Sequence, residues 1–123
     1  MSGTIQFEER ELKPYAQPVS AGELREGEVY FLLTYLDDEM LIPTMATVVF
    51  LGRNLGPGEA GILYFQDVQS YNRGVPYDWE SDEDREGTFF HCSERETGSV
   101  FEYDGALDGL LGCLMRRKAR RLD

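Results

Sequence analysis

Two short apolar runs stand in the middle of the chain, on either side of a stretch rich in glycine. Residues 47–51 (Thr-Val-Val-Phe-Leu) and 62–66 (Ile-Leu-Tyr-Phe-Gln) are almost entirely β-branched, aromatic or leucine, types that suit a pleated, partly buried surface. Residues that interrupt regular structure lie between them: Gly52, Gly56, Pro57, Gly58 and Gly61. The pattern predicts two strands that pair as a hairpin and form the spine of a small, mostly β domain.

Residues 28–36 form a third apolar run, Glu-Val-Tyr-Phe-Leu-Leu-Thr-Tyr-Leu, in which both alternating sets of positions are largely apolar. A strand of this kind has neighbours against both faces, so we predict a central strand, or one that lines a barrel and is also covered by a helix. Because periodicity does not settle so short a run, a helix is the competing interpretation. The β-branched and aromatic content, with Gly27 in front, favours a strand. Residues 37–39 predict a turn, and Pro43, which lacks an N–H, is expected at an edge or a bend.

Two short helical turns are predicted from capping signals. Ser20 and Glu23 have the spacing of a capping box, which predicts a single turn over residues 21–26. Asp67 is placed to cap a short helix over residues 68–73 because its carboxylate can accept the first free amides.

Three further segments have the composition of strands. Residues 5–7 predict a short edge strand, which the charged residues that follow would end. Residues 88–92 and 99–103 each contain two Phe or Tyr rings. Residues 94–98, which end in Gly98, lie between them, so we predict that they pair with each other as a second hairpin.

The C-terminal segment has the clearest pattern. Apolar side chains recur at helical spacing: Leu107, Leu110, Leu111, Leu114 and Met115. Asp104 is expected at the N-cap, and the five cations within residues 116–121 crowd the final turns, where positive charge complements the helix dipole. Gly105, Gly109 and Gly112 each cost about 1 kcal/mol relative to alanine. Packing of the leucine stripe on the sheet must therefore hold this helix, and the glycines would permit a close approach.

These elements predict an α+β, mainly β fold. We expect a small, partly open barrel of SH3-like type, or a strongly bent antiparallel sheet of five to six strands, with the C-terminal amphipathic helix packed on it. The chain is expected to be a single domain over residues 1–123. Within it we distinguish an extended N-terminal segment (1–19), an acidic loop (78–87) and a basic C-terminal tail (116–123).

Composition narrows the class of protein. The 123 residues are 41% hydrophobic and carry a formal net charge of −11, which disfavours nucleic acid as the main partner because phosphate binding depends on Lys and Arg. No apolar run approaches the ~20 residues of a membrane span, and no secretory signal follows Met1. We therefore expect a cytoplasmic protein, of bacterial type from its size and simplicity. Cys92 and Cys113 are expected to be reduced and buried.

Several segments resemble functional motifs, but the residues around them do not match what each function requires. Residues 56–61 match G-x-G-x-x-G but precede a strand, whereas a dinucleotide site requires a helix there. Residues 82–93 begin like an EF-hand loop, but position twelve is Ser93 instead of glutamate. His91 and Cys92 would point to opposite faces of a strand, and one His with two Cys falls short of four zinc ligands. We predict no catalytic residue, no metal and no cofactor, and hence a protein that is not an enzyme.

A cluster of aromatic and acidic residues is the predicted binding surface, because such a surface can contact a basic or proline-containing segment. Its members are Tyr71, Arg73, Tyr77, Trp79, Asp82, Glu83 and Asp84. The competing interpretation is that these rings close one end of a barrel. We predict a non-enzymatic interaction module that binds a basic protein partner, of immunity or adaptor type.

Two alternative functions remain open. One is a small-molecule-binding protein or enzyme with its site in the mouth of the barrel. The other is an RNA-associated accessory domain that uses the Arg-rich tail, although the acids of residues 78–86 would compete for those cations.

Overall fold

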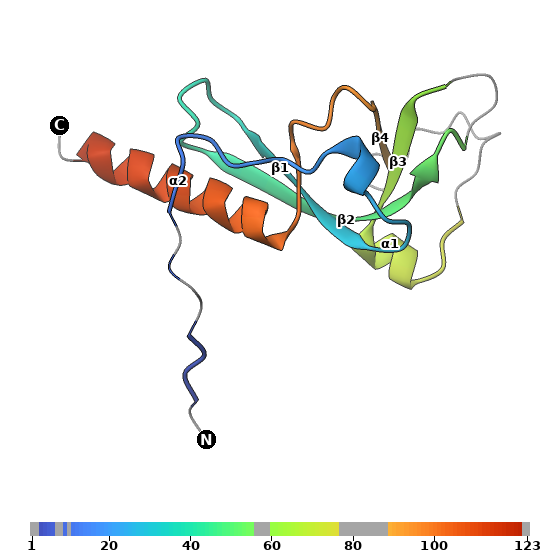
Figure 1. The fold of residues 1–123 in the computed structure, drawn as a ribbon, viewed down its shortest axis with the longest axis horizontal. Coiled ribbons are helices and arrows are strands. Elements are labelled where there is room, and N and C mark those ends of the chain that lie inside the picture. Colours follow the sequence, from blue (N-terminus) through green and yellow to red (C-terminus); the bar gives the residue numbers. More distant parts are fainter. Residues whose placement is uncertain (1–2, 7–8, 10, 56–59, 77–88, 122–123) are drawn as a thin grey trace.

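The computed structural model describes residues 3–6, 9, 11–55, 60–76 and 89–121. Within these ranges five strands, two α-helices and one 3₁₀ turn follow one another along the chain (Figure 1). They are η1 (Ala21–Glu23), β1 (Val29–Tyr35), β2 (Pro43–Arg53), β3 (Ile62–Asp67), α1 (Val68–Asn72), β4 (Phe89–Ser93), β5 (Val100–Phe101) and α2 (Tyr103–Arg121). The α+β, mainly β class is confirmed, as an open antiparallel sheet with a C-terminal helix.

The sheet has the strand order β4-β3-β2-β1-β5. The predicted central hairpin is confirmed, with Phe50 of β2 opposite Phe65 of β3. β2 is longer than predicted because it pairs with β1 over Pro43–Val49 and with β3 from Val48 onward. The register with β3 shifts between Phe50 and Gly52, where Gly52 adopts a φ of +148° that few side chains tolerate.

The predicted pairing of residues 88–92 with residues 99–103 is wrong. β4 pairs with β3 and β5 pairs with β1, so the two strands lie at opposite edges of the sheet. Each strand gains burial at its own edge: Phe90 packs on the main core, and Phe101 is buried beside α2. Loop length therefore did not decide the pairing, because burial of apolar side chains dominates strand placement.

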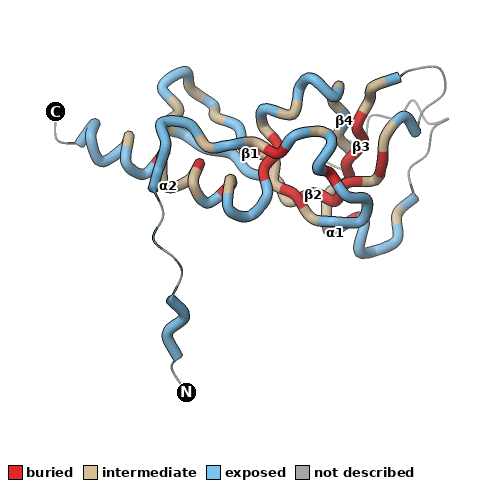
Figure 2. The backbone as a smooth tube through the Cα atoms, viewed as in Figure 1, coloured by how far each residue is buried: buried red, intermediate tan, exposed pale blue. Residues whose placement is uncertain are grey.

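β1 is a central strand with apolar contacts on both faces, as predicted. On one face Tyr30 and Leu32 pack in the main core with Phe50 and Phe65 of the neighbouring strands. On the other face Phe31, Leu33 and Tyr35 pack with the smaller cluster under α2. Figure 2 shows that the buried residues are concentrated on the sheet, whereas much of α2 is exposed or half-buried.

α2 packs against β1 and β5, but not through the predicted stripe. Its buried residues are Ala106, Gly109 and Cys113. Of the predicted stripe, Leu110 packs in the smaller cluster, whereas the side chains of Leu107, Leu114 and Met115 are 45%, 42% and 56% exposed. The prediction that the leucines cover the sheet is therefore wrong for most of the stripe.

Two glycines explain this orientation of α2. A Cβ added at Gly109 would lie 2.5 Å from Leu33 Cδ2, and one added at Gly105 would lie 2.7 Å from the carbonyl oxygen of Gln17. Only small residues fit at such distances, so the glycines face the sheet and the larger side chains turn away. The expected close approach is confirmed at these two glycines but not at Gly112, where an added Cβ would meet only Arg116 Nη1. Asp104 lies in the first turn of α2 and is not its N-cap, since the helix begins at Tyr103.

The shorter elements follow their capping signals in part. Asp67 accepts the amides of Gln69 and Ser70 at 3.1 and 3.2 Å and caps α1, as predicted. The turn predicted over residues 21–26 is limited to η1, and Ser20 Oγ donates to Glu23 Oε1 at 2.8 Å instead of capping a backbone amide. Of the edge strand predicted over residues 5–7, Ile5 and Gln6 are not in a strand, and Phe7 lies outside the described residues.

Cations of α2 hold the predicted turn between β1 and β2. Arg116 Nε donates to the carbonyl oxygen of Met40 at 3.0 Å, and Arg117 Nη1 donates to that of Leu41 at 2.8 Å. Arg120 forms an ion pair with Glu39 at 2.9 Å. The cationic end of α2 therefore serves partly to fix this turn. Within the described ranges, no helix has both the length and the apolar character needed to span a bilayer.

Candidate binding cleft

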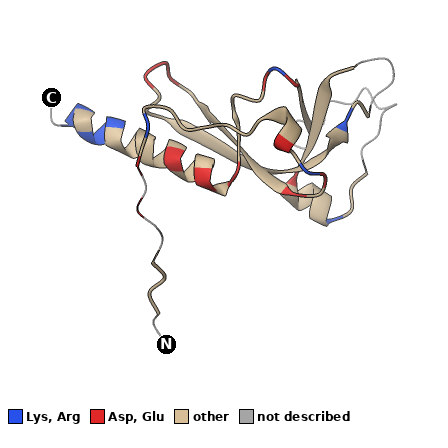
Figure 3. Cartoon of the chain, viewed as in Figure 1, with Lys and Arg blue, Asp and Glu red and all other residues tan. Residues whose placement is uncertain are grey.

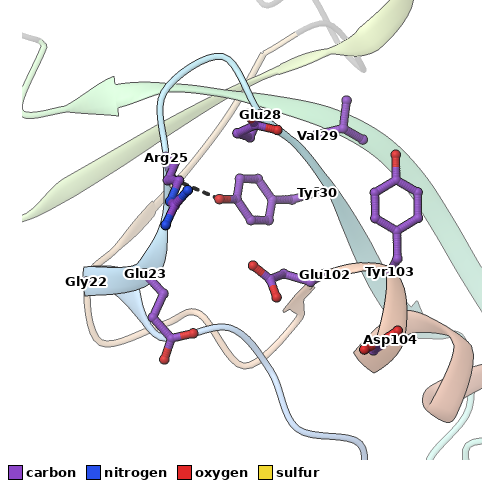
Figure 4. Close-up of a pocket in the computed structure, with 9 residues that line it drawn as sticks. All are labelled: Gly22, Glu23, Arg25, Glu28, Val29, Tyr30, Glu102, Tyr103 and Asp104. Atoms are coloured by element: carbon purple, nitrogen blue, oxygen red, sulfur yellow. Dashed lines mark hydrogen bonds between the residues drawn. The ribbon is translucent and has the colours of Figure 1, made fainter. Parts of the chain in front are cut away.

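An open cleft of about 760 Å³ lies between η1, the beginning of β1 and the beginning of α2 (Figure 4). The residues that line it come from two distant parts of the sequence: Gly22, Glu23, Arg25, Glu28, Val29 and Tyr30, together with Glu102, Tyr103 and Asp104. The two groups meet because β5 pairs with β1, which places the end of β5 near the beginning of β1. The cleft is thus a product of the sheet order.

The wall formed by η1 is attached to the sheet through Arg53 of β2. Its guanidinium donates to the carbonyl oxygen of Ala21 and, at 3.4 Å, to that of Leu24. The same guanidinium lies 5.2 Å from the centre of the Phe50 ring, a cation–π distance. Because the Leu24 side chain is also buried, at 4% exposed, η1 is held by both polar and apolar contacts.

Two tyrosines form the aromatic part of the cleft. Tyr30 is only 2% exposed, and its hydroxyl oxygen accepts the amide of Arg25 at 2.8 Å (Figure 4). Tyr103 is 67% exposed. Its ring packs edge-on against Phe31, with centroids 4.9 Å apart and planes at 75°. Tyr30 is therefore held in place as a buried side of the cleft, while Tyr103 exposes to the solvent a ring that is packed against Phe31.

The cleft is strongly acidic. Of the described residues that line it, four are acidic, Glu23, Glu28, Glu102 and Asp104, and Arg25 is the only basic one. Figure 4 shows the Glu102 and Tyr103 side chains across the hollow from Arg25. A cationic side chain would find both carboxylates and an aromatic ring here, the two partners that favour Lys and Arg.

The described part of the cleft has the groups for binding but not those for catalysis by a nucleophile. None of its described lining residues is His, Cys, Ser or Thr, so the usual pairing of a nucleophile with a base is missing from them. Over the described ranges of the chain, no group of three or more His, Cys, Asp and Glu side chains is arranged to hold a metal ion.

The surface predicted from residues 71–84 is described only in its first part. Tyr71, on α1, is 43% exposed, and Arg73 is exposed just after that helix. Neither lines the cleft, but a Cβ added at Gly27 would lie 4.0 Å from the Tyr71 hydroxyl, which places this ring close to the loop before Glu28. The other predicted members lie outside the described residues: Tyr77, Trp79, Asp82, Glu83 and Asp84.

The acids of the cleft were not singled out as a site in the sequence, because they match no motif. Their signal is their position next to strands: Glu28 directly precedes β1 and Glu102 directly follows β5. In an antiparallel pair, the start of one strand lies beside the end of the other. The wrong pairing of the segment at residues 99–103 therefore concealed this site.

Of the two cysteines expected to be buried, Cys113 is buried and Cys92 is half-buried. Cys113 is buried, and its Sγ lies 3.4 Å from the carbonyl oxygen of Leu41. Cys92 is half-buried and packs against the main core, whereas its neighbour His91 is exposed. Burial, and then the charge of Glu96, raise the pKa of the Cys92 thiol. A raised pKa lowers the thiolate fraction and hence the nucleophilicity of this group.

A second hollow, of about 370 Å³, lies where the N-terminal segment crosses β1 and α2. Tyr15 and Ala16 of that segment, Leu33 and Tyr35 of β1, and Gly109 of α2 are among its lining residues. Both hollows reach the size of about 300 Å³ from which small-molecule sites begin.

Comparison of the chain with protein-family models, with curated proteins and with solved structures found no match.

Proposed function

We propose that this protein is a non-enzymatic interaction module and that its acidic cleft binds a cationic segment of a protein partner. The observation that carries the proposal is the lining of the 760 Å³ cleft, where four carboxylates and two tyrosines accompany one arginine. Charge-assisted hydrogen bonds to a carboxylate are roughly twice as strong as neutral ones. A lysine or arginine seated beside Tyr103 would also gain a cation–π contact.

A peptide segment fits this cleft better than a compact ion does. The acids come from three places, η1, the loop before β1 and the start of α2, so they are spread along an open surface. Tyr103 stands exposed at one side on the support of Phe31. Exposed, well-supported tyrosines are frequent among residues that dominate binding energy. The net charge of −11 would in addition attract a basic partner from a distance.

The surface predicted from the sequence can be part of the same interface. Tyr71 lies near Gly27, and Glu28 of the cleft follows directly in the chain. A basic partner of immunity or adaptor type would then contact the cleft with one segment and the neighbourhood of α1 with another. The interface would thus combine the acids found in the structure with the aromatic cluster predicted from the sequence.

We also propose that the sheet is a partly open barrel of SH3-like type. In support, β1 to β4 follow one another across the sheet, and β5 returns to the free edge of β1. Only six residues, 94–99, separate β4 from β5 at the opposite edges, which favours a curved sheet.

The RNA alternative has less support. Arg116, Arg117 and Arg120 contact the turn between β1 and β2, so three of the five cations of the tail already have partners within the chain. The small-molecule alternative is favoured only by the size of the two hollows.

The proposal is tested by titrating a fluorescent hexa-lysine peptide into the protein. The variant Glu28→Gln/Glu102→Gln removes two charges from the cleft, and the control Glu9→Gln/Glu11→Gln removes two from the exposed N-terminal segment. We expect the cleft variant to raise the dissociation constant at least about tenfold, the equivalent of about 1.4 kcal/mol, and the control to change it little. Equal losses in the two variants would show that the peptide responds only to net charge and would contradict the proposal. Affinity capture from lysate with the wild type and the cleft variant would then identify the partner.

A further inference from the structure

The outward face of α2 carries a row of apolar side chains, which we call the outer stripe: Leu107, Leu111, Leu114 and Met115. Three of them are between 42% and 56% exposed, and Leu111 is half-buried. At 1.5 Å per residue the stripe extends over about 12 Å. None of these four belongs to either buried cluster.

Rotation of α2 cannot bury this stripe within the chain. Gly105 and Gly109 face the N-terminal segment and β1, at distances where a Cβ would meet Gln17 or Leu33. A leucine turned into that contact would need several ångströms of extra space. In the described structure the outer stripe therefore lies on the surface.

The two ends of the outer face have opposite charge. Asp104 lies in the first turn of α2, while Lys118 and Arg121 lie in its last turns (Figure 3). Residues 104, 111, 118 and 121 fall on the same side of a helix as Leu107 and Leu114, because their spacings are three, four and seven. Arg116, Arg117 and Arg120 instead reach toward the turn between β1 and β2.

We propose that the outer stripe binds the same stripe of a second copy of this chain, with the two α2 helices antiparallel. A two-fold axis near Leu111 would place Leu107 of one copy near Met115 of the other. It would also place Asp104 of each copy beside Lys118 and Arg121 of the other. The surface is thus self-complementary in charge and in apolar pattern, as a two-fold interface requires. A parallel pair would instead bring like charges together.

A second feature favours a second copy as the occupant. The N-terminal segment crosses α2 at Ala16 and Gln17, and the described residues that precede this crossing project away from the sheet (Figure 1). Its apolar side chains Ile5, Leu12 and Tyr15 are 79%, 39% and 74% exposed. A copy docked on α2 would lie within reach of this segment, which would enlarge the interface beyond the helices. The proposal rests on the outer stripe and not on the function of the cleft, although Asp104 belongs to both surfaces.

The first test is sedimentation velocity over a range of concentrations. We expect the wild type to move from monomer to dimer, and Leu107→Gln/Leu114→Gln to raise the dissociation constant of the dimer at least about 30-fold, since central interface residues contribute about 2 kcal/mol or more. The control Leu36→Gln/Leu55→Gln replaces two side chains that are 73% and 40% exposed elsewhere and should dimerise like the wild type. Circular dichroism checks that each variant is folded.

A charge exchange tests the antiparallel arrangement. Asp104→Lys alone and Lys118→Glu/Arg121→Glu alone each place like charges at both ends of the pair, so each should dimerise less than the wild type. Mixed in equal amounts, the two variants should form a heterodimer, because every opposed pair is then of opposite sign.

Three results would overturn the proposal: a wild type that stays monomeric up to about 1 mM, a dimer that survives the outer-stripe substitutions, or no heterodimer in the mixture. Binding of a monomeric wild type to vesicles containing phosphatidylserine, lost in Leu107→Gln/Leu114→Gln, would also overturn it and assign the stripe to a lipid surface.

Discussion

Replacing Gly109 with alanine adds a single methyl group at the closest contact between α2 and β1. The new Cβ would lie 2.5 Å from Leu33 Cδ2, and Leu33 is itself 3% exposed and packed in the smaller cluster. Gly112, one turn further along, offers a matched control. A Cβ there would meet only Arg116 Nη1, at 3.3 Å, a terminal atom of a side chain whose Nε donates to the carbonyl oxygen of Met40.

The magnitude follows from two opposing terms. Alanine in place of glycine favours an α-helix by about 1 kcal/mol at either position. Overpacking of a close-packed contact costs about 1–3 kcal/mol, and it applies only at Gly109. We therefore expect Gly112→Ala to be neutral or stabilising by up to about 1 kcal/mol, and Gly109→Ala to be less stable than Gly112→Ala by about 1–3 kcal/mol.

Urea unfolding followed by circular dichroism measures both variants. A double-mutant cycle with Leu33→Val isolates the contact: shortening the leucine should cost less in Gly109→Ala than in the wild type, with a coupling of at least about 0.5 kcal/mol. If Gly109→Ala were as stable as Gly112→Ala, or if the cycle showed no coupling, the argument that small residues set the distance and orientation of α2 would be refuted.

Two further predictions concern the loops that frame the sheet. Arg53→Met keeps an apolar stem over Phe50 but loses the hydrogen bond to the carbonyl oxygen of Ala21. We expect the free energy of unfolding in urea to fall by about 1–3 kcal/mol and the hexa-lysine peptide to bind more weakly. If neither quantity changed, Arg53 would not hold η1 in place. Desolvation alone would raise the pKa of Asp37, but the hydrogen bonds that its carboxylate accepts from the amides of Leu41 and Ile42 together lower this pKa below its usual 3.8. The stability from this carboxylate is therefore present above pH 3.8 and is lost as the pH falls through the lowered folded value. The advantage of the wild type over Asp37→Asn in urea midpoint should shrink over that range, and a pH-independent difference would contradict the assignment.

Local pattern was sufficient to predict several elements of the fold. The apolar runs became β1, β2 and β3, and Asp67 caps α1 as its position suggested. Short-range signals of this kind succeed because the period of apolar residues and the chemistry of a cap act within a few residues.

Short-range signals of this kind could not predict the candidate site. Glu28 and Glu102 are far apart in the sequence, and the pairing of β1 with β5 brings their two segments to one cleft. The sequence instead predicted a binding surface from aromatic and acidic residues that lie close together in the chain, around Tyr71 and Trp79. Of that set, the structure describes only Tyr71 and Arg73. A surface that depends on long-range pairing leaves no local motif by which to find it.

The sequence by itself determined the main strands and helices and the acidity of the chain, because backbone preference, apolar period and charge are properties of neighbouring residues. Tertiary structure alone decided that β5 joins β1, that an acidic cleft results, and that α2 turns its glycines inward and its leucines outward. The physical reason is that a periodic pattern shows that a helix has an apolar side, whereas contact distance decides which side is used. At the contact of Gly109 with Leu33 there is space for a hydrogen atom but not for a methyl group.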